Sequence, residues 1–320
     1  MTAGVSCDAS LAKHRRNGQL SVEDLRAPDW QVEGRDWPNR DCSRFVDAGG
    51  LRWHVQRCGA GPVCLLIHGT GASTHSFRDL MPLLATHFDV IAIDLPGHGF
   101  TSRPVALEGL SLPGMARSLA ELLSILEARP ALVIGHSAGA AIAARLVLDR
   151  EVEPRCLISL NGALLPLSGF KHPAFTPLVR AVVSSHWLPR WFAKRLESPR
   201  EVDRLLEGTG SRVDERGREF YGRLSRCPAH TGAALAMMGV WDLRPLEQEL
   251  VRLIVPLHLL IGGQDRMILP GEAVKVRRLV PSATVEQWPS LGHLAHEEAP
   301  ARLADWVLAR AQADGIVVPS

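Results

Sequence analysis

Short apolar runs recur along the chain and end in small or polar residues. Five of them are apolar at almost every position: Val63–Ile67, Val90–Ile93, Ala131–Ile134, Cys156–Leu160 and Leu257–Ile261. Runs this short that are apolar on both faces are typical of buried parallel strands. We expect one further strand from Thr284 to Trp288.

Helix-length segments lie between these runs. Residues 113–128 carry Met115, Leu119 and Leu122 at helical spacing, and residues 138–149 and 298–311 are further helical stretches. Strands that alternate with helices indicate a doubly wound, mostly parallel α/β sheet. In such a sheet the ligand crevice lies at the carboxyl ends of the strands, so the chemistry is expected where the apolar runs end.

Residues 164–250 interrupt this alternation. They have helical spacing but no clear buried strand, so we expect a helical cap inserted between two core strands. Before the core, residues 1–42 are polar and are broken by Pro28 and Pro38. The predicted organisation is an N-terminal arm that is partly mobile (1–42), an α/β core (43–163 and 251–312), the cap (164–250) and a C-terminal tail (313–320).

Composition and charge narrow the function classes. The 320 residues are 46% hydrophobic and 22% charged, which suits a folded protein and excludes a disordered or fibrous chain. The 36 basic and 34 acidic residues give a net charge of +2, so nothing electrostatic favours nucleic acid as a partner. No apolar run approaches the ~20 residues of a spanning helix, and none follows Arg15-Arg16. We therefore expect no secretion signal and a cytoplasmic location.

The six cysteines form no CxxC pair and no dense framework. Because cytosolic proteins keep their thiols reduced, we expect six free thiols rather than disulfides or a metal site.

The motif GHSAG, residues 135–139, follows a predicted strand and opens an alanine-rich helix. G-x-S-x-G in that context is typical of a sharp turn that exposes a nucleophilic serine at the top of a sheet. Ser137 is therefore the candidate nucleophile. The plainer alternative is a glycine-rich structural turn.

A nucleophilic serine needs a base, and the base needs an orienting group. Where such a turn carries the serine, the chain order is serine, acid, histidine. Asp265 follows the run 257–261, and His293 follows the last predicted strand. Both come after Ser137 in the required order, so we expect Asp265 and His293 to complete a catalytic triad.

Three rivals fit less well. Asp94 precedes the serine and reads better as part of a turn. Asn161 follows a predicted strand, but an amide cannot carry the charge that stabilises an imidazolium. His296 fits a neighbouring or surface group better than the base.

The oxyanion of an acyl-transfer reaction needs two preorganised backbone donors. The amides of Ala138, directly after the serine, and of Thr70, in the loop His68-Gly69-Thr70-Gly71, are the candidates. A tight turn that needs glycine would also explain the loop. No nucleotide-binding or H-E-x-x-H pattern is present, so no cofactor and no metal are expected.

The cap supplies further candidates for substrate binding. Residues 168–196 hold five Lys or Arg and no Asp or Glu, interleaved with aromatic and aliphatic residues. Three explanations stay open: cap helices with a solvated basic face, a pocket for a flat apolar ligand with carboxylates such as a porphyrin, or a membrane-surface patch. The candidate substrate-binding residues are His136, Asn161, Trp187, Trp191, Met238 and Trp241.

The core, from about Val46 to Leu308, resembles the α/β-hydrolase superfamily. From about Gly34 to Pro300 the chain also resembles the magnesium-chelatase accessory proteins of bacteriochlorophyll biosynthesis. The supporting stretches are GRDWPNR (34–40), GLRWHVQ (50–56), HGTGASTHS (68–76), GHSAGAAIAAR (135–145), SLNGALLP (159–166), GTGS (208–211) and LGHLAHEE (291–298).

The superfamily resemblance implies an α/β-hydrolase fold with an inserted cap, with Ser137, Asp265 and His293 at the triad positions. The closer resemblance implies a place near magnesium insertion into protoporphyrin and an association with magnesium chelatase. We expect a serine hydrolase of the esterase or acyl-transfer type that acts on a small molecule with an ester or similar carbonyl. The alternatives are a tetrapyrrole-binding, chelatase-assisting protein with a non-essential triad, and a carbon–carbon bond hydrolase.

Overall fold

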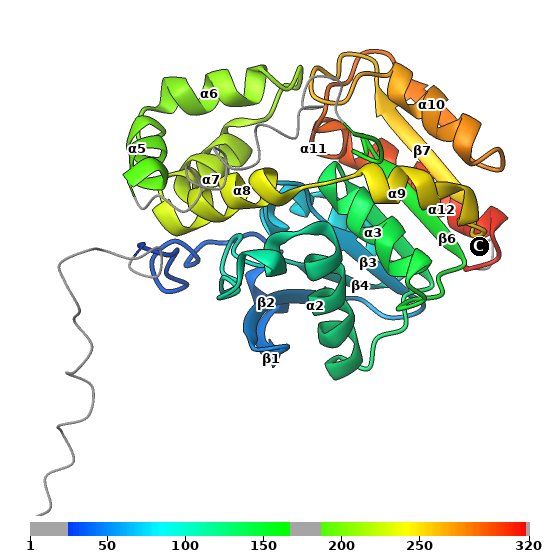
Figure 1. Ribbon diagram of the computed structural model, residues 1–320, viewed down its shortest axis with the longest axis horizontal. Coiled ribbons are helices and arrows are strands. Elements are labelled where there is room, and N and C mark those ends of the chain that lie inside the picture. Colours follow the sequence, from blue (N-terminus) through cyan, green and yellow to red (C-terminus); the bar gives the residue numbers. More distant parts are fainter. Residues whose placement is uncertain (1–24, 167–186, 318–320) are drawn as a thin grey trace, which may run out of the picture.

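The structure is a computed structural model that describes residues 25–166 and 187–317. A sheet runs through its centre in the order β1-β2-β4-β3-β5-β6-β7-β8 (Figure 1). Neighbouring strands from β4 to β8 are parallel, whereas β2 pairs antiparallel with both β1 and β4. The strands are β1 Ser43–Ala48, β2 Leu51–Cys58, β3 Val63–Ile67, β4 Asp89–Ile93, β5 Leu132–His136, β6 Cys156–Leu160, β7 Leu257–Gly262 and β8 Thr284–Trp288.

Helices cover both faces of the sheet, and the side chains of β3 show why. Successive residues of a strand point to opposite faces. Leu65 and Ile67 therefore join one apolar cluster with α2, α3 and α10, while Cys64 and Leu66 join another with α1 and α12. The predicted doubly wound, mostly parallel sheet is confirmed. These helices are α1 Leu80–Leu84, α2 Leu112–Ile125, α3 Ala138–Leu148, α10 Gly271–Leu279, α11 Ala295–Glu298 and α12 Pro300–Ala313.

A group of helices lies between β6 and β7 in the chain, where the cap was expected. Within it, α8 packs against both α5 and α7. Figure 1 shows α5 to α8 above the upper edge of the sheet, and α9 beside α3. We call these the cap helices: α5 Trp187–Arg195, α6 Pro199–Glu207, α7 Glu215–Ser225, α8 Pro228–Val240 and α9 Arg244–Glu249.

The described part of the N-terminal arm, residues 25–42, joins the cap to the core. Trp37 packs with Phe220 of α7, and its ring N–H donates to Thr74 Oγ1 at 3.1 Å. Arg223 of α7 pairs with Asp36 at 2.6 Å. The described part of the arm is therefore packed against both the cap and the core at Trp37. Residues 1–24 lie outside the described ranges.

The expectation of six free thiols is wrong, because Cys42 and Cys58 form a disulfide. The antiparallel pairing of β1 with β2 places Ser43 opposite Gln56. Cys42 and Cys58, just beyond that pair, are thereby brought to a Cα–Cα distance of 5.6 Å. Cys64, Cys156 and Cys227 are free and buried.

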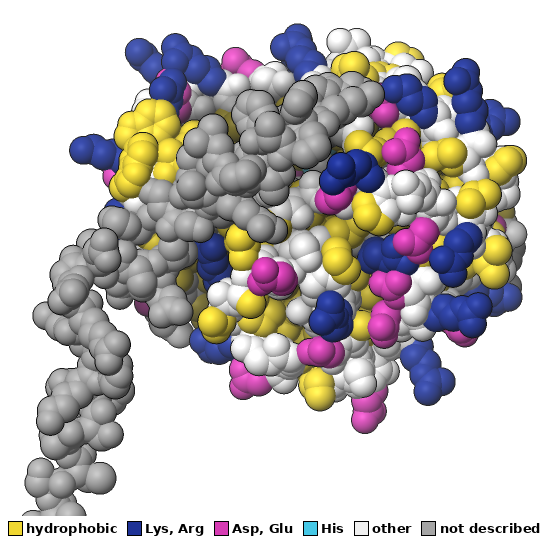
Figure 2. Space-filling model, viewed as in Figure 1, with side chains coloured by type: hydrophobic (Ala, Val, Ile, Leu, Met, Phe, Trp, Pro, Cys, Tyr) yellow, Lys and Arg dark blue, Asp and Glu magenta, His cyan; other side chains and the backbone are white. Residues whose placement is uncertain are grey.

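Surface charges of both signs are interspersed over the core in Figure 2, in keeping with the small net charge. Among residues 25–166 and 187–317, no helix combines the length and apolar character that crossing a membrane requires.

Candidate active site

Ser137 lies on a strained turn between β5 and α3. Its backbone has φ 52° and ψ −119°, a conformation that non-glycine residues rarely adopt. The turn is held by the Ser137 amide, which donates to the Leu160 carbonyl at 3.0 Å. Close packing also requires glycine at the neighbouring positions: a Cβ on Gly139 would lie 2.2 Å from the Ile67 carbonyl oxygen. This is the geometry expected for an exposed nucleophile.

Asp265 and His293 meet at the carboxyl ends of β7 and β8. His293 Nδ1 lies 2.8 Å from Asp265 Oδ2, and both residues are buried. A carboxylate only accepts hydrogen bonds, so the proton lies on Nδ1 and Nε2 keeps its lone pair. The imidazole is thereby held in the tautomer that a general base requires.

The carboxylate of Asp265 is saturated with donors. Oδ1 accepts from the amides of Met267 and Ile268 at 2.8 and 2.9 Å. Oδ2 accepts from His293 and also from Asn161 Nδ2, at 2.8 Å. Asn161, predicted as a substrate-binding residue, therefore contacts the acid directly. Its side chain is fully buried at the end of β6.

His136 connects the serine turn to the histidine loop. Its Nε2–H donates to the His293 carbonyl at 3.0 Å, and the two rings lie 4.8 Å apart. Burial, reinforced by the nearby rings of His296 and His293, lowers the pKa of His136 well below its ordinary value. The ring is therefore neutral, and its hydrogen bond ties the His293 backbone to the residue that precedes Ser137. His136 is predicted from the sequence to bind substrate, but its contacts fit a positioning role.

One predicted oxyanion donor directly follows Ser137 in the chain, and the loop that carries the other approaches Ser137. Ala138 is the first residue of α3, so its N–H has no partner within the helix. The loop 68–71 approaches from β3: a Cβ on Gly69 would lie 2.8 Å from Ser137 Cβ. His68 shapes this loop by accepting from the Leu95 amide at 2.9 Å and donating to the Gly69 carbonyl at 2.7 Å. Thr70 follows directly.

Helix α8 of the cap holds the loop 68–71 from above. His230 Nε2–H donates to the Gly71 carbonyl at 3.1 Å, while His230 Nδ1 accepts from the Gly99 amide at 3.0 Å. Met237 Sδ accepts from Thr70 Oγ1 at 3.4 Å. Burial lowers the pKa of His230 to about 4, so this bridging ring is neutral at pH 7. Sequence analysis did not single out His230.

A cap loop also touches the loops that carry the acid and the base. The Thr209 carbonyl accepts from the His293 amide at 3.3 Å. A Cβ on Gly210 would lie 2.0 Å from the Gln264 carbonyl oxygen, and one on Gly292 would lie 2.4 Å from Gly210. Only glycines permit this approach. The stretch 208–211 was noted in the sequence for its resemblance alone, and this contact explains it physically.

A buried polar network lies behind the histidine loop. Ser76 Oγ donates to Glu297 Oε1 and bonds His296 Nε2, both at 2.7 Å. Glu297 also pairs with Arg78 and accepts from Tyr221 Oη at 2.7 Å. Burial lowers the pKa of His296 to about 3, so its ring is neutral. His296 is thus a structural neighbour of the site, as expected, and it does not contact the acid.

Four predicted cap residues are not brought to this cluster. Trp187, Trp191 and Met238 are exposed over 48–60% of their surface, whereas the neighbouring Met237 is fully buried. Trp241 packs partly buried against the main core cluster. Of the basic, aromatic segment 168–196, residues 168–186 lie outside the described ranges.

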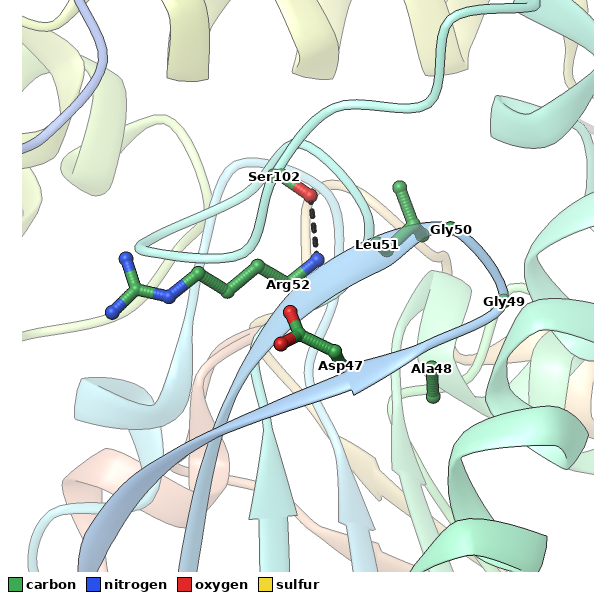
Figure 3. Close-up of a pocket in the computed structure, with 7 residues that line it drawn as sticks. All are labelled: Asp47, Ala48, Gly49, Gly50, Leu51, Arg52 and Ser102. Carbon is green, nitrogen blue, oxygen red and sulfur yellow. Dashed lines mark hydrogen bonds between the residues drawn. The ribbon is translucent and has the colours of Figure 1, made fainter.

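Two other features of the described residues do not belong to this site. Cys156, His258 and Asp314 place side-chain S, N and O atoms within 4.8 Å of one another. They lie near the opposite edge of the sheet, where Cys156 begins β6, and His258 donates to Asp314 at 2.8 Å. A shallow hollow at the β1–β2 hairpin is lined by residues 47–52 and Ser102 (Figure 3). None of the predicted catalytic residues lines that hollow.

Comparisons with known proteins identify the family of this chain. The family model described as alpha/beta hydrolase fold matches residues 62–300. The chain is 37% identical over 275 residues to the magnesium-chelatase 30 kDa subunit of Rhodobacter capsulatus. This alignment covers 85% of this chain and 95% of that protein. It is 26% identical over 270 residues to 2-(acetamidomethylene)succinate hydrolase of Mesorhizobium japonicum, covering 81% and 91% of the two chains.

A solved structure shows the same fold. The alpha/beta hydrolase fold protein of Burkholderia ambifaria superposes with a TM-score of 0.70 at 23% identity, covering 84% of this chain and 98% of that one. The family match, the relatives and the strand order together lead to one conclusion: this chain belongs to the α/β-hydrolase fold family and is related within it to the magnesium-chelatase 30 kDa subunit.

Proposed function

We propose that the protein is a serine hydrolase of the esterase or acyl-transfer type. One observation carries the proposal: His293 is oriented by Asp265 at 2.8 Å, and its ring lies 4.8 Å from that of His136, the residue before a serine on a strained strand-to-helix turn. Burial of both partners strengthens this interaction, because the local dielectric is low. Ser137 is the nucleophile, His293 the base and Asp265 the orienting acid.

The proposed reaction has two steps, acylation of Ser137 and deacylation. Ser137 Oγ attacks the carbonyl carbon of an ester while its proton passes to His293 Nε2, and the amides of Thr70 and Ala138 stabilise the oxyanion. The carbon–oxygen bond to the alcohol then breaks, and His293 returns the proton to the leaving oxygen. Water or a second alcohol attacks the acyl-serine by the same route, which releases the acid or a new ester and restores Ser137.

Labelling with a fluorophosphonate tests this proposal. We expect intact mass to show one adduct on the wild type and none on Ser137→Ala. Turnover of a p-nitrophenyl ester should fall by about 10⁴-fold or more in the same variant, because removing the nucleophile leaves only binding and oxyanion stabilisation. Equal labelling of both proteins, or no labelling of folded wild type, would contradict an activated serine.

A second candidate function is a tetrapyrrole-binding, chelatase-assisting protein in which the triad is not essential. The likeness to the magnesium-chelatase 30 kDa subunit favours it. Titration with protoporphyrin, read from the Soret band, tests binding, and co-purification with chelatase subunits tests association. An unshifted band at micromolar protein would count against it.

Carbon–carbon bond hydrolysis uses the same triad and differs only in substrate, so substrate profiling separates it from ester hydrolysis. The expected cytoplasmic location stays a prediction.

A further inference from the structure

Helix α5 of the cap has a buried face and an exposed face. Pro189 and Ala193, one turn apart, are buried. Pro189 lies against α8, where a Cβ added to Gly232 would be 3.1 Å from Pro189 Cγ. The helix is therefore packed tightly on α8 through this side, and the opposite side is turned away from the protein.

The exposed face carries two tryptophans and two cations. Trp187, Trp191, Lys194 and Arg195 follow one another at spacings of four, three and one residues, which places them on one helical stripe. Trp187 is 60% exposed and Trp191 is 48% exposed. Figure 2 shows hydrophobic side chains gathered over the position of α5, with Lys and Arg side chains around them. We call this stripe the α5 outer face.

The charges on this face are of one sign. Helix α5 contains Arg190, Lys194 and Arg195 and no Asp or Glu. Glu201, at the start of α6, is already engaged by Arg195 at 2.9 Å and by Arg204. The Arg195 guanidinium also lies 5.9 Å from the Trp191 ring centroid. An aromatic surface rimmed by cations therefore faces the solvent.

We propose that the α5 outer face docks on an anionic lipid surface. Tryptophan rings settle at the boundary of acyl chains and headgroups, and Lys and Arg attract anionic lipids. The face has too few apolar residues for a stable protein interface, which buries at least about 1,200 Å². Membrane attachment, in contrast, is built from a few aromatic anchors with cations beside them. The proposal is independent of the hydrolase chemistry, since none of these residues contacts Ser137, Asp265 or His293.

Vesicle sedimentation tests the proposal on the full chain. Vesicles of equal parts phosphatidylglycerol and phosphatidylcholine are compared with pure phosphatidylcholine, at about 0.1 M and about 0.5 M salt. The variants are Trp187→Ala/Trp191→Ala and Lys194→Gln. The matched control is Val105→Ala/Ile254→Ala, which removes two apolar side chains that are 96% and 91% exposed elsewhere. Thermal melting confirms that each variant is folded.

We expect wild type and the control variant to bind the anionic vesicles and to be released by the higher salt. The double tryptophan variant should bind at least about tenfold more weakly, and Lys194→Gln a few-fold more weakly. Equal binding by the double tryptophan variant, or no preference for anionic vesicles, would overturn the proposal. A wild-type dimer in the absence of lipid that dissociates in the tryptophan variant would assign the face to a second copy instead.

Discussion

Two histidine–aspartate pairs stand near opposite edges of the same sheet. His293 and Asp265 lie at the carboxyl ends of β7 and β8, and His258 and Asp314 lie near the amino end of β7. The nitrogen–oxygen distance is 2.8 Å in both pairs. By this distance alone, the two pairs are indistinguishable.

The two pairs differ in whether the second ring nitrogen of the histidine also forms a hydrogen bond. His258 Nδ1 bonds Thr284 Oγ1 at 2.6 Å, so both nitrogens of that ring are engaged. Within the described residues, the ring of His293 forms a hydrogen bond only through Nδ1, and it lies 4.8 Å from the ring of His136, which precedes the strained Ser137. A histidine–carboxylate contact is therefore compatible with the role of a general base only when the other ring nitrogen is left available. Where both nitrogens are satisfied, the pair ties two segments together, here β7 and the end of α12.

Exchanging one carboxylate for an amide in each pair should give the largest difference in kcat between the two pairs. We expect Asp265→Asn to lower kcat by about 10⁴-fold, because the amide favours the wrong tautomer of His293. Asp314→Asn should leave kcat within about twofold and lower the free energy of unfolding by about 2 kcal/mol. Ester hydrolysis and urea unfolding of both variants measure this. Similar activity losses from the two substitutions would refute the distinction.

His230 adds a third case, a buried histidine with no carboxylate partner. Its pKa in the folded state is about 4, against 6.5 when unfolded. Between these values the unfolded chain binds more protons, so stability falls as the pH is lowered through that window. From pH 7 to pH 5, His230 should account for about 2 kcal/mol of lost stability.

Urea unfolding of wild type and His230→Gln at both pH values isolates that contribution. Glutamine can still donate to Gly71, but it does not titrate. The wild type should lose about 2 kcal/mol more than the variant over this range. Identical losses would show that His230 is not the group responsible.

Asn161 gives the smallest expected effect and tests how the acid is held. Asn161→Ala removes one donor from Asp265 Oδ2, a hydrogen bond worth about 1 kcal/mol. We expect kcat to fall about tenfold with KM within about twofold, since the residue positions Asp265 rather than touching substrate. A large rise in KM with unchanged kcat would instead support the substrate-binding role predicted from sequence.

The parallel half of the sheet was predictable because its strands are buried on both faces. Leu65 and Leu66, on opposite faces of β3, are both fully buried, and such runs stand out in a sequence. The triad candidates followed from those strand ends and from chain order. In contrast, β1 and β2 were not predicted, because the predicted strands rest mainly on runs that are apolar on both faces, whereas β2 alternates Arg52, His54 and Gln56 with apolar residues, the pattern of a strand with one covered face. The turn residues Gly49 and Gly50, both with positive φ, were a further signal.

The contacts around the acid could not be predicted, because they depend on which strands lie side by side. Asn161 meets Asp265 because β6 neighbours β7. Likewise, Cys42 meets Cys58 only through the register of an unrecognised hairpin. The anchoring of the loop 68–71 by His230 depends on how the cap settles on the core, and a histidine on an alanine-rich helix gives no sign of it.

The arm that joins the cap to the core also bears on how the chain folds. Asp36 and its partner Arg223 are 187 residues apart, and Arg26 lies 201 residues from Cys227. Contacts of such high sequence separation form late, because the whole intervening loop must close first. During synthesis, the arm therefore has to wait until the cap has been made, while the hairpin that carries Cys42 and Cys58 can form early and keep the arm close to its docking place. We therefore expect seating of the cap to be a late step of folding, and removing residues 25–41 to slow that step without deleting any proposed catalytic residue.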